Sequence, residues 1–260
     1  MADTQHPYPQ GTPCWLDMHA DDQDAALGFY RELFGWTAEP NPRQEGYVVL
    51  SLEGKAVAGI GPKLRGMPGG AVAWNLYFAI DDIEAAAERI TRLGGILYLG
   101  PADVPQAGRQ LLAADPASAP FGLWRAAPFP GFEARMRPGA PVWFELETPQ
   151  GPHSADFYGA LLGVEVQKMP MEPDSYWVLM VNGEQAAGIW QAGHAALSPQ
   201  RAARWGPYFL VTETDAAAHQ AIAAGARLVT EPKDSPYGRL CTLRDPQGAQ
   251  FSLIAAPTPA

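Results

Sequence analysis

The chain has 260 residues, of which 47% are hydrophobic, 18% charged and 10% aromatic, and its formal net charge is -10. The low charge and the many aromatic side chains exclude a globally disordered protein. An acidic chain lacks the excess of Lys and Arg that would neutralise the phosphates of a nucleic acid, so we expect no nucleic-acid partner. The first residues lack a signal-peptide pattern, and no apolar run approaches the ~20 residues that span a bilayer. We therefore expect a cytoplasmic protein with no membrane partner.

The first half of the chain is predicted to run through the same order of elements twice. A helix at 23–34 begins at Asp21 or Asp22 and ends at Gly35, and a second helix at 83–93 begins at Asp81 or Asp82. Residues 1–12 precede these elements as a tail. The predicted strands are 15–19, 47–52, 56–60, 74–80, 96–99, 109–114 and 121–125.

The second half is predicted to repeat this layout after a linker rich in proline and glycine at 127–140. Its helices are expected at 153–162 and 215–224. Its strands are expected at 142–147, 176–181, 186–190, 207–211, 227–230, 239–243 and 250–254. The segments at 61–70 and 191–200 read as loops, either lids over a cavity or ordinary connections.

The two halves also match residue by residue, which indicates an internal duplication. The matched pairs include Pro13/Pro141, Trp15/Trp143, Phe29/Phe157, Tyr30/Tyr158, Leu33/Leu161, Gly35/Gly163, Tyr47/Tyr176, Gly59/Gly188 and Trp74/Trp205. Their order is preserved with only small insertions. The duplication predicts two similar domains, at 13–126 and 141–256, each large enough to hold its own core.

Three motifs of the chain resemble the vicinal oxygen chelate superfamily, which includes glyoxalase I, bleomycin-resistance proteins and extradiol dioxygenases. They are the helix motif with Asp22, Phe29, Tyr30, Phe34 and Gly35, the strand WNLYFAIDD (74–82) and the closing strand DPQGAQFSLI (245–254). The likeness is greatest to two-domain glyoxalase-like proteins of the actinomycete type. It implies an α+β fold, a tandem duplication in which each domain has two βαβββ units that form a curved mixed sheet around a cavity.

The resemblance also implies where a metal would be bound, and the ligands are missing there. Metal-dependent members use His, Gln or Glu from the first, fourth, fifth and eighth strands. The matching positions outside the fourth strands are Trp15, Asn75 and Gly122 in the first half and Trp143, Gly206 and Ser252 in the second. The fourth strands (56–60 and 186–189) offer no ligand side chain. Trp and Gly have no side-chain atom that binds a transition metal, and Asn and Ser are poor ligands for one, so we expect no metal and no cofactor.

Polar side chains on the first strand of each half are the candidate reactive groups. Alternation along a strand places Leu16 and Met18, like Phe144 and Leu146, on the face that packs against the helix. The opposite face is expected to line the cavity. The catalytic candidates on it are Asp17, His19, Glu145 and Glu147. The candidates for substrate binding are Trp15, Asn75, Tyr77, Arg109, Trp124, Trp143, Tyr208 and Arg239.

Two functions remain open at this point. One is metal-independent acid/base chemistry of the isomerase, lyase or cyclase type on a small aromatic or carbonyl compound. The other is binding of a drug or metabolite, as in bleomycin-resistance proteins, because acidic cavities lined by aromatic rings suit planar cations. Structural roles for the acids and packing roles for the tryptophans are the alternatives. We expect a small-molecule ligand and either a monomer or a homodimer.

Overall fold

The computed structural model describes residues 8–40, 45–63, 72–171, 175–191 and 203–257. Most of the predicted tail at 1–12 and of the predicted loops at 61–70 and 191–200 lies outside these residues. The chain forms two compact units. Unit 1 comprises Met1–Trp15, Asn75–Gly131 and Trp143–Trp205, and unit 2 comprises Leu16–Trp74, Phe132–Val142 and Gly206–Ala260. Each unit therefore combines parts of both sequence halves, and the predicted boundaries at 127–140 stay a prediction.

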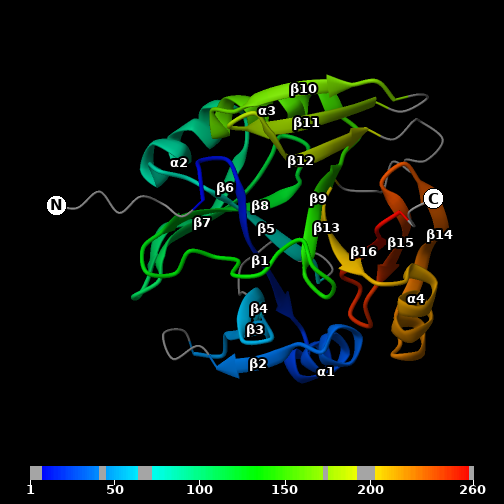
Figure 1. Cartoon of the computed structure of the whole chain (residues 1–260). Coiled ribbons are helices and arrows are strands. Elements are labelled where there is room, and N and C mark those ends of the chain that lie inside the picture. Colours follow the sequence, from blue (N-terminus) through cyan, green and yellow to red (C-terminus); the bar gives the residue numbers. More distant parts are fainter. Residues whose placement is uncertain (1–7, 41–44, 64–71, 172–174, 192–202, 258–260) are drawn as a thin grey trace. The chain divides into compact units, whose positions relative to one another are not determined.

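The elements of the two halves follow one another in the same order (Figure 1). The first half contains β1 (Pro13–Ala20), α1 (Gln23–Phe34), β2 (Thr37–Pro40), β3 (Val48–Leu52), β4 (Lys55–Pro62), β5 (Trp74–Ala79), α2 (Ile83–Arg92), β6 (Ile96–Val104), β7 (Gly108–Ala114) and β8 (Pro120–Ala126). The second half contains β9 (Pro141–Glu147), α3 (Gly151–Leu162), β10 (Glu165–Met169), β11 (Ser175–Val181), β12 (Glu184–Gln191), β13 (Arg204–Val211), α4 (Thr214–Ala223), β14 (Arg227–Ser235), β15 (Gly238–Arg244) and β16 (Gln250–Ala255).

Each sequence half carries an eight-stranded mixed sheet, and the two sheets have the same strand order. The order is β2-β3-β4-β1-β5-β8-β7-β6 in the first half and β10-β11-β12-β9-β13-β16-β15-β14 in the second. In every βαβββ unit the first strand pairs in parallel with the last strand of the same unit. The sheets are open, with β2, β6, β10 and β14 at their ends. The predicted tandem duplication of an α+β domain is confirmed.

The strands β2 and β10 were not among the predicted elements. Their sequences, TAEP and EVQKM, show no apolar alternation, and most of their side chains are exposed. Both are edge strands that pair on one side only, with β3 and β11. An edge strand with polar side chains needs no buried face, so hydrophobic periodicity does not detect it.

The two open questions about helix caps are settled by geometry. The carboxylate of Asp22 accepts a hydrogen bond from the backbone N–H of Ala25 at 3.0 Å and caps α1, and Asp82 does the same for α2 with Ala85. A side-chain acceptor at this position satisfies one of the unpaired N–H groups of the first turn. The neighbouring residue Asp81 is not the cap.

A buried Trp–Tyr–Asp triad lies in unit 2. The hydroxyl of Tyr30 on α1 donates to the carboxylate of Asp245 at 2.9 Å and accepts from the indole N–H of Trp74 at 3.1 Å. The other oxygen of Asp245 accepts from the backbone N–H groups of Gln247 and Ala249. Burial raises the pKa of Asp245, and burial together with this carboxylate raises the pKa of Tyr30. The triad thus ties α1 to the turn that precedes β16.

The matching triad lies in unit 1. Trp205 donates to the hydroxyl of Tyr158 at 2.9 Å, and Asp115 is the carboxylate partner of Tyr158. Asp115 also accepts from the backbone N–H of Ala119 at 2.8 Å and from Ser154 at 3.4 Å. Burial raises the pKa of Asp115 as well. Tyr30 and Trp74 match Tyr158 and Trp205 in the repeat, and Asp115 and Asp245 each precede a proline, so the duplication has kept this buried network twice.

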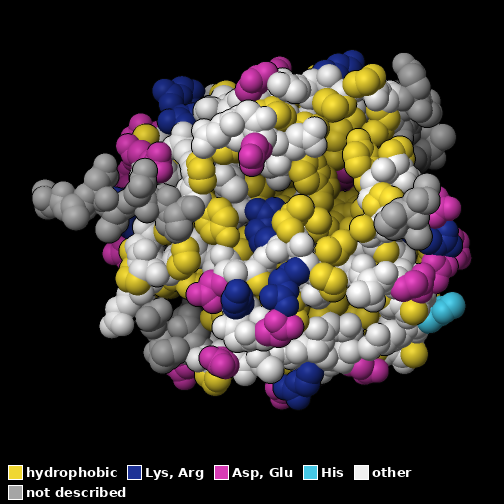
Figure 2. All heavy atoms as spheres, viewed as in Figure 1, with side chains coloured by type: hydrophobic (Ala, Val, Ile, Leu, Met, Phe, Trp, Pro, Cys, Tyr) yellow, Lys and Arg dark blue, Asp and Glu magenta, His cyan; other side chains and the backbone are white. Residues whose placement is uncertain are grey.

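On the face drawn in Figure 2, Asp and Glu side chains are interspersed with Lys and Arg side chains, and apolar side chains lie between them. Charge of one sign does not cover this face continuously.

None of the helices in the described part of the chain is long and apolar enough to cross a membrane.

Candidate functional site

The first candidate site lies in unit 2, around Asp17 of β1. Asp17 is 4% exposed, and its register partner on the parallel strand β4 is Gly59. The hydroxyl of Tyr47, from the residue before β3, donates to Oδ2 of Asp17 at 3.4 Å. The tyrosine hydroxyl gives the buried carboxylate a hydrogen-bond donor, which offsets part of the cost of removing this polar group from water.

His19 lies two residues further along β1, beside the same carboxylate. Its Nε2 atom is 3.9 Å from Oδ1 of Asp17, and its Nδ1 atom is 2.9 Å from the backbone carbonyl of Pro62. A carbonyl only accepts, so this contact assigns the hydrogen to Nδ1 and leaves Nε2 facing the carboxylate. Asp17, Tyr47 and His19 therefore form one group of ionisable side chains that can hold or pass on a proton.

The second candidate site repeats this arrangement in unit 1. Glu145 of β9 pairs in parallel register with Gly188 of β12. The hydroxyl of Tyr176 on β11 donates to Oε2 of Glu145 at 2.8 Å, and it accepts from the indole N–H of Trp143 at 3.1 Å. Glu145, Tyr176 and Trp143 are half-buried. The pair of a carboxylate and a tyrosine thus occurs at the same place of both halves.

The two sites differ at the position of His19. Its counterpart in the second half is Glu147, which forms an ion pair with Arg204 at 2.5 Å. The register partner of His19 on β4 is Gly61, whereas that of Glu147 on β12 is Trp190. The first site therefore has a histidine next to its acid, and the second has a carboxylate that an arginine neutralises.

The aromatic candidates of the first half lie in unit 1. Trp15 and Trp124 both contact Phe129, with ring centroids at 4.9 Å and 6.1 Å, and the indole of Trp124 donates to the carbonyl of Phe129 at 3.0 Å. Trp15, Trp124, Asn75 and Tyr77 are all buried. The two tryptophans therefore pack around Phe129. A role in substrate binding stays a prediction for all four.

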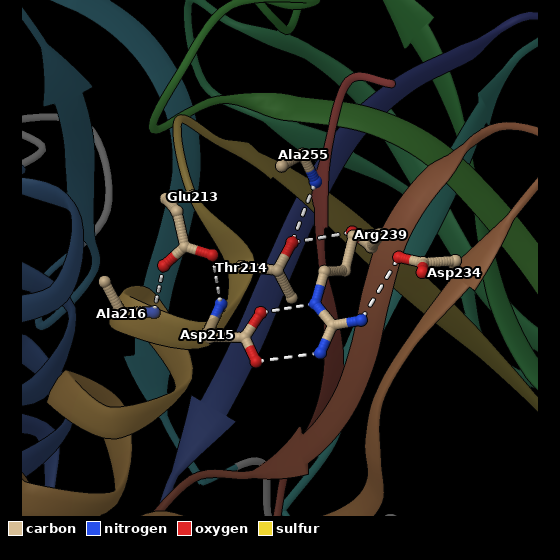
Figure 3. Close-up of polar contacts among 7 residues, drawn as sticks. All are labelled: Glu213, Thr214, Asp215, Ala216, Asp234, Arg239 and Ala255. Atoms are coloured by element: carbon tan, nitrogen blue, oxygen red, sulfur yellow. Dashed lines mark hydrogen bonds and ion pairs between the residues drawn. The ribbon is translucent and has the colours of Figure 1, made fainter. Parts of the chain in front are cut away.

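The two arginine candidates bind carboxylates of their own units. Arg109 forms ion pairs with Glu84 and Asp103. Arg239 lies between Asp215, which it contacts through two nitrogens, and Asp234, as Figure 3 shows. These ion pairs raise the pKa of Arg239 and lower that of Asp215.

Arg239 also lines a hollow of about 390 Å³ in unit 2. The hydroxyl of Thr214 at this hollow donates to the carbonyl of Arg239 and accepts from the N–H of Ala255. Tyr208, the remaining candidate of the second half, is half-buried on β13 of the same unit.

The structure places the predicted site residues in both units. Asp17, His19, Tyr208 and Arg239 belong to unit 2. The candidates in unit 1 are Trp15, Asn75, Tyr77, Arg109, Trp124, Trp143, Glu145 and Glu147. Tyr47, Tyr176 and Arg204 were not among the predicted site residues. The first two were visible in the sequence as a matched pair of the repeat, but a matched tyrosine is more often a core residue.

The positions at which the resemblance implies metal ligands do not fit a metal. A side chain at Gly122 has no room, because a Cβ atom there would lie 2.2 Å from the ring of Tyr77. The hydroxyl of Ser252 at the matching position bonds to that of Thr242 at 3.0 Å. Trp15 has no atom that ligates a transition metal. Within the described residues, no group of three or more His, Cys, Asp and Glu side chains is arranged to hold a metal ion.

Solved structures with the same fold include a metal-bound glyoxalase and a dioxygenase. A Mn(II)-bound glyoxalase from Novosphingobium aromaticivorans superposes with a TM-score of 0.64 at 13% identity, over 95% of this chain and 82% of the other. The 2,3-dioxygenase LapB from Pseudomonas sp. KL28 superposes with a TM-score of 0.63 at 12% identity, over 97% and 94%. At these identities the likeness shows the fold.

Two relatives match nearly the whole chain in sequence. The glyoxylase candidate CFP32 of Mycobacterium tuberculosis is 36% identical over 95% of this chain and 95% of its own length. The anthracycline biosynthesis protein DnrV of Streptomyces peucetius is 34% identical over 95% of this chain and 94% of its own. A family model described as a glyoxalase-like domain matches residues 15–124 and again residues 143–254. The chain therefore belongs to the glyoxalase-like domain family of the vicinal oxygen chelate superfamily, with the domain present twice.

Proposed function

We propose that the chain catalyses a metal-independent proton transfer on a small aromatic compound that carries a carbonyl group. Asp17 is the proposed acid and base. The observation that carries the proposal is the group of Asp17, Tyr47 and His19, in which a carboxylate that is 4% exposed has a hydroxyl donor and an imidazole beside it. A positioned carboxylate of this kind contributes about 10²–10⁴-fold to a proton-transfer step.

The proposed step needs no external reactant. The carboxylate of Asp17 takes a proton from a carbon next to the substrate carbonyl, and the electron pair of that C–H bond moves into an enolate. The proton then returns at another carbon or to a leaving oxygen, which gives an isomer or a dehydrated product. Tyr47 orients the carboxylate, and Nε2 of His19, held by the bond between Nδ1 and Pro62, accepts the proton from Asp17 and returns it.

The substrate class rests on the relatives. DnrV is named for anthracycline biosynthesis, and anthracyclines are planar polycyclic aromatic compounds with carbonyl groups. We therefore propose a planar polycyclic aromatic carbonyl compound as the substrate. The implied ligand positions support chemistry without a metal. The ring of Tyr77 occupies the space that a side chain at Gly122 would need, and the hydroxyl of Ser252 bonds to that of Thr242.

A direct assay tests this proposal. The purified protein is treated with a chelator, its metal content is measured, and it is incubated with a panel of planar aromatic ketones and diketones. We expect an isomer or a dehydrated product, detected by liquid chromatography and mass spectrometry, at the same rate before and after chelation. Turnover that disappears with the metal and returns when it is added back would contradict the proposal.

A second candidate function is binding of a planar cation at the second site. Trp143 and Tyr176 place aromatic rings beside Glu145, and such a combination attracts a flat cationic ligand. Calorimetric titration with planar cationic drugs tests it, with Trp143→Ala as the variant expected to weaken binding. Saturable binding without any turnover would favour this function over catalysis.

A further inference from the structure

Two glycines lie where the acid and the tyrosine of each site meet. The strands lie in the order β3-β4-β1. Tyr47 directly precedes β3, Asp17 lies on β1, and Gly59 lies between them on β4. The order β11-β12-β9 repeats this with Gly188. The tyrosine ring therefore has to cross the middle strand in order to reach the acid, and it crosses at a glycine in both halves.

The space above each glycine is taken by the tyrosine. A Cβ atom on Gly59 would lie 1.8 Å from the hydroxyl oxygen of Tyr47 and 2.3 Å from its ring carbon Cζ. On Gly188 the corresponding distances to Tyr176 would be 1.9 Å and 2.6 Å. A methyl group and a hydroxyl cannot approach this closely, so the ring has to move when either glycine gains a side chain.

Backbone conformation does not explain these glycines. Neither Gly59 nor Gly188 has the positive φ angle that favours glycine elsewhere in the chain, such as the 71° of Gly35 at the end of α1. An L-residue fits the backbone at both positions. The close approach of the tyrosine is therefore the reason for glycine.

We infer that Gly59 and Gly188 are positioning residues. Because they have no side chain, the rings of Tyr47 and Tyr176 can cross β4 and β12 and donate hydrogen bonds to the acids of the two sites. Gly59 acts on Asp17 through Tyr47. The inference about geometry is independent of the reaction, whereas the expected effect on turnover rests on the proposed function. Gly59→Ala displaces the Tyr47 hydroxyl and removes a donor from the buried carboxylate.

Nuclear magnetic resonance of protein labelled with ¹³C at Cζ of tyrosine tests the geometry. Tyr47→Phe assigns the Tyr47 resonance, and Asp17→Ala shows where it moves when its hydrogen-bond acceptor is removed. We expect Gly59→Ala to shift this resonance while leaving that of Tyr176 in place, and Gly188→Ala to do the reverse. The control is Gly28→Ala on α1, where a Cβ atom meets nothing within 4 Å, and it is expected to shift neither.

The same variants separate the inference from the proposed function. With a substrate in hand, Gly59→Ala is expected to lower kcat about 10- to 100-fold, as far as Tyr47→Phe does, with KM nearly unchanged and an altered pH profile. A Tyr47 resonance that stays in place in Gly59→Ala overturns the inference. A resonance that moves without any change in turnover supports the inference and contradicts the proposed role of Tyr47 in orienting Asp17.

A double variant keeps the test valid if Gly59→Ala does not fold. In Tyr47→Ala the ring is gone, so adding Gly59→Ala to it is expected to leave the thermal unfolding temperature close to that of Tyr47→Ala alone. If the double variant is unfolded while Tyr47→Ala is folded, the glycine serves another purpose and the inference is wrong.

Discussion

Replacing Asp17 by asparagine is expected to lower kcat about 10²–10⁴-fold with little change in KM. Asparagine has nearly the same shape, and its carbonyl oxygen still accepts the hydrogen bond of Tyr47. It cannot take up a proton in the way a carboxylate does, so the loss appears in the chemical step. Steady-state kinetics on the substrate found by the assay above measures both constants.

Two variants control this prediction. Asp21→Asn removes an exposed carboxylate that follows the same strand and pairs with Lys63 at 2.7 Å, and it is expected to leave kcat unchanged. Glu145→Gln alters the matching acid of the second site and is expected to lower kcat far less than Asp17→Asn. An equal loss in Asp17→Asn and Glu145→Gln would show that the first site does not carry the reaction alone.

Replacing Asp245 by alanine is expected to destabilise the folded chain by about 2–4 kcal/mol. The substitution leaves the hydroxyl of Tyr30 and the backbone N–H groups of Gln247 and Ala249 without the acceptor they have now, and Asp245 is only 4% exposed. Urea denaturation measures the free energy of unfolding. The control is Asp234→Ala, where the carboxylate is largely exposed, with an expected change within about 0.5 kcal/mol.

The two triads also predict a pH dependence of stability. Burial raises the pKa of Asp115 and Asp245 in the folded chain, so the folded state keeps these protons at pH values at which the unfolded chain has lost them. Their contribution to stability is full below the unfolded pKa, near 3.8, and is lost as the pH rises through the folded value. Relative to the Asp115→Asn/Asp245→Asn variant, the wild type is expected to lose stability as the pH rises from about 4. A constant difference would contradict this.

Much of the fold was predictable because it depends on short-range patterns. The Asp-Asp pairs before the first two helices and the helix end at Gly35 are local signals, although only the structure chose Asp22 and Asp82 as the caps. The repeat doubled the evidence for each element. The helix-facing positions of the first strands, Leu16 and Phe144, are buried as predicted. Only the two polar edge strands carried no pattern that sequence reasoning could use.

The site was less predictable because it depends on register between three strands. Asp17 and Glu145 were predictable from alternation along one strand. That Tyr47 and Tyr176 cross a glycine to reach these acids follows from pairings that local patterns do not contain. Arg204 was missed for a similar reason, since its partner Glu147 is 57 residues away in the chain.

Hydrogen exchange into the ligand tests the central claim most directly, because it reports proton transfer itself. The chelator-treated protein is incubated in D₂O with a planar aromatic ketone that it binds, and deuterium next to the carbonyl group is measured by mass spectrometry. We predict incorporation with the wild type and with Asp21→Asn, and about 10²-fold slower incorporation or none with Asp17→Asn. Equal rates for the wild type and Asp17→Asn would contradict the assignment of Asp17 as the acid and base.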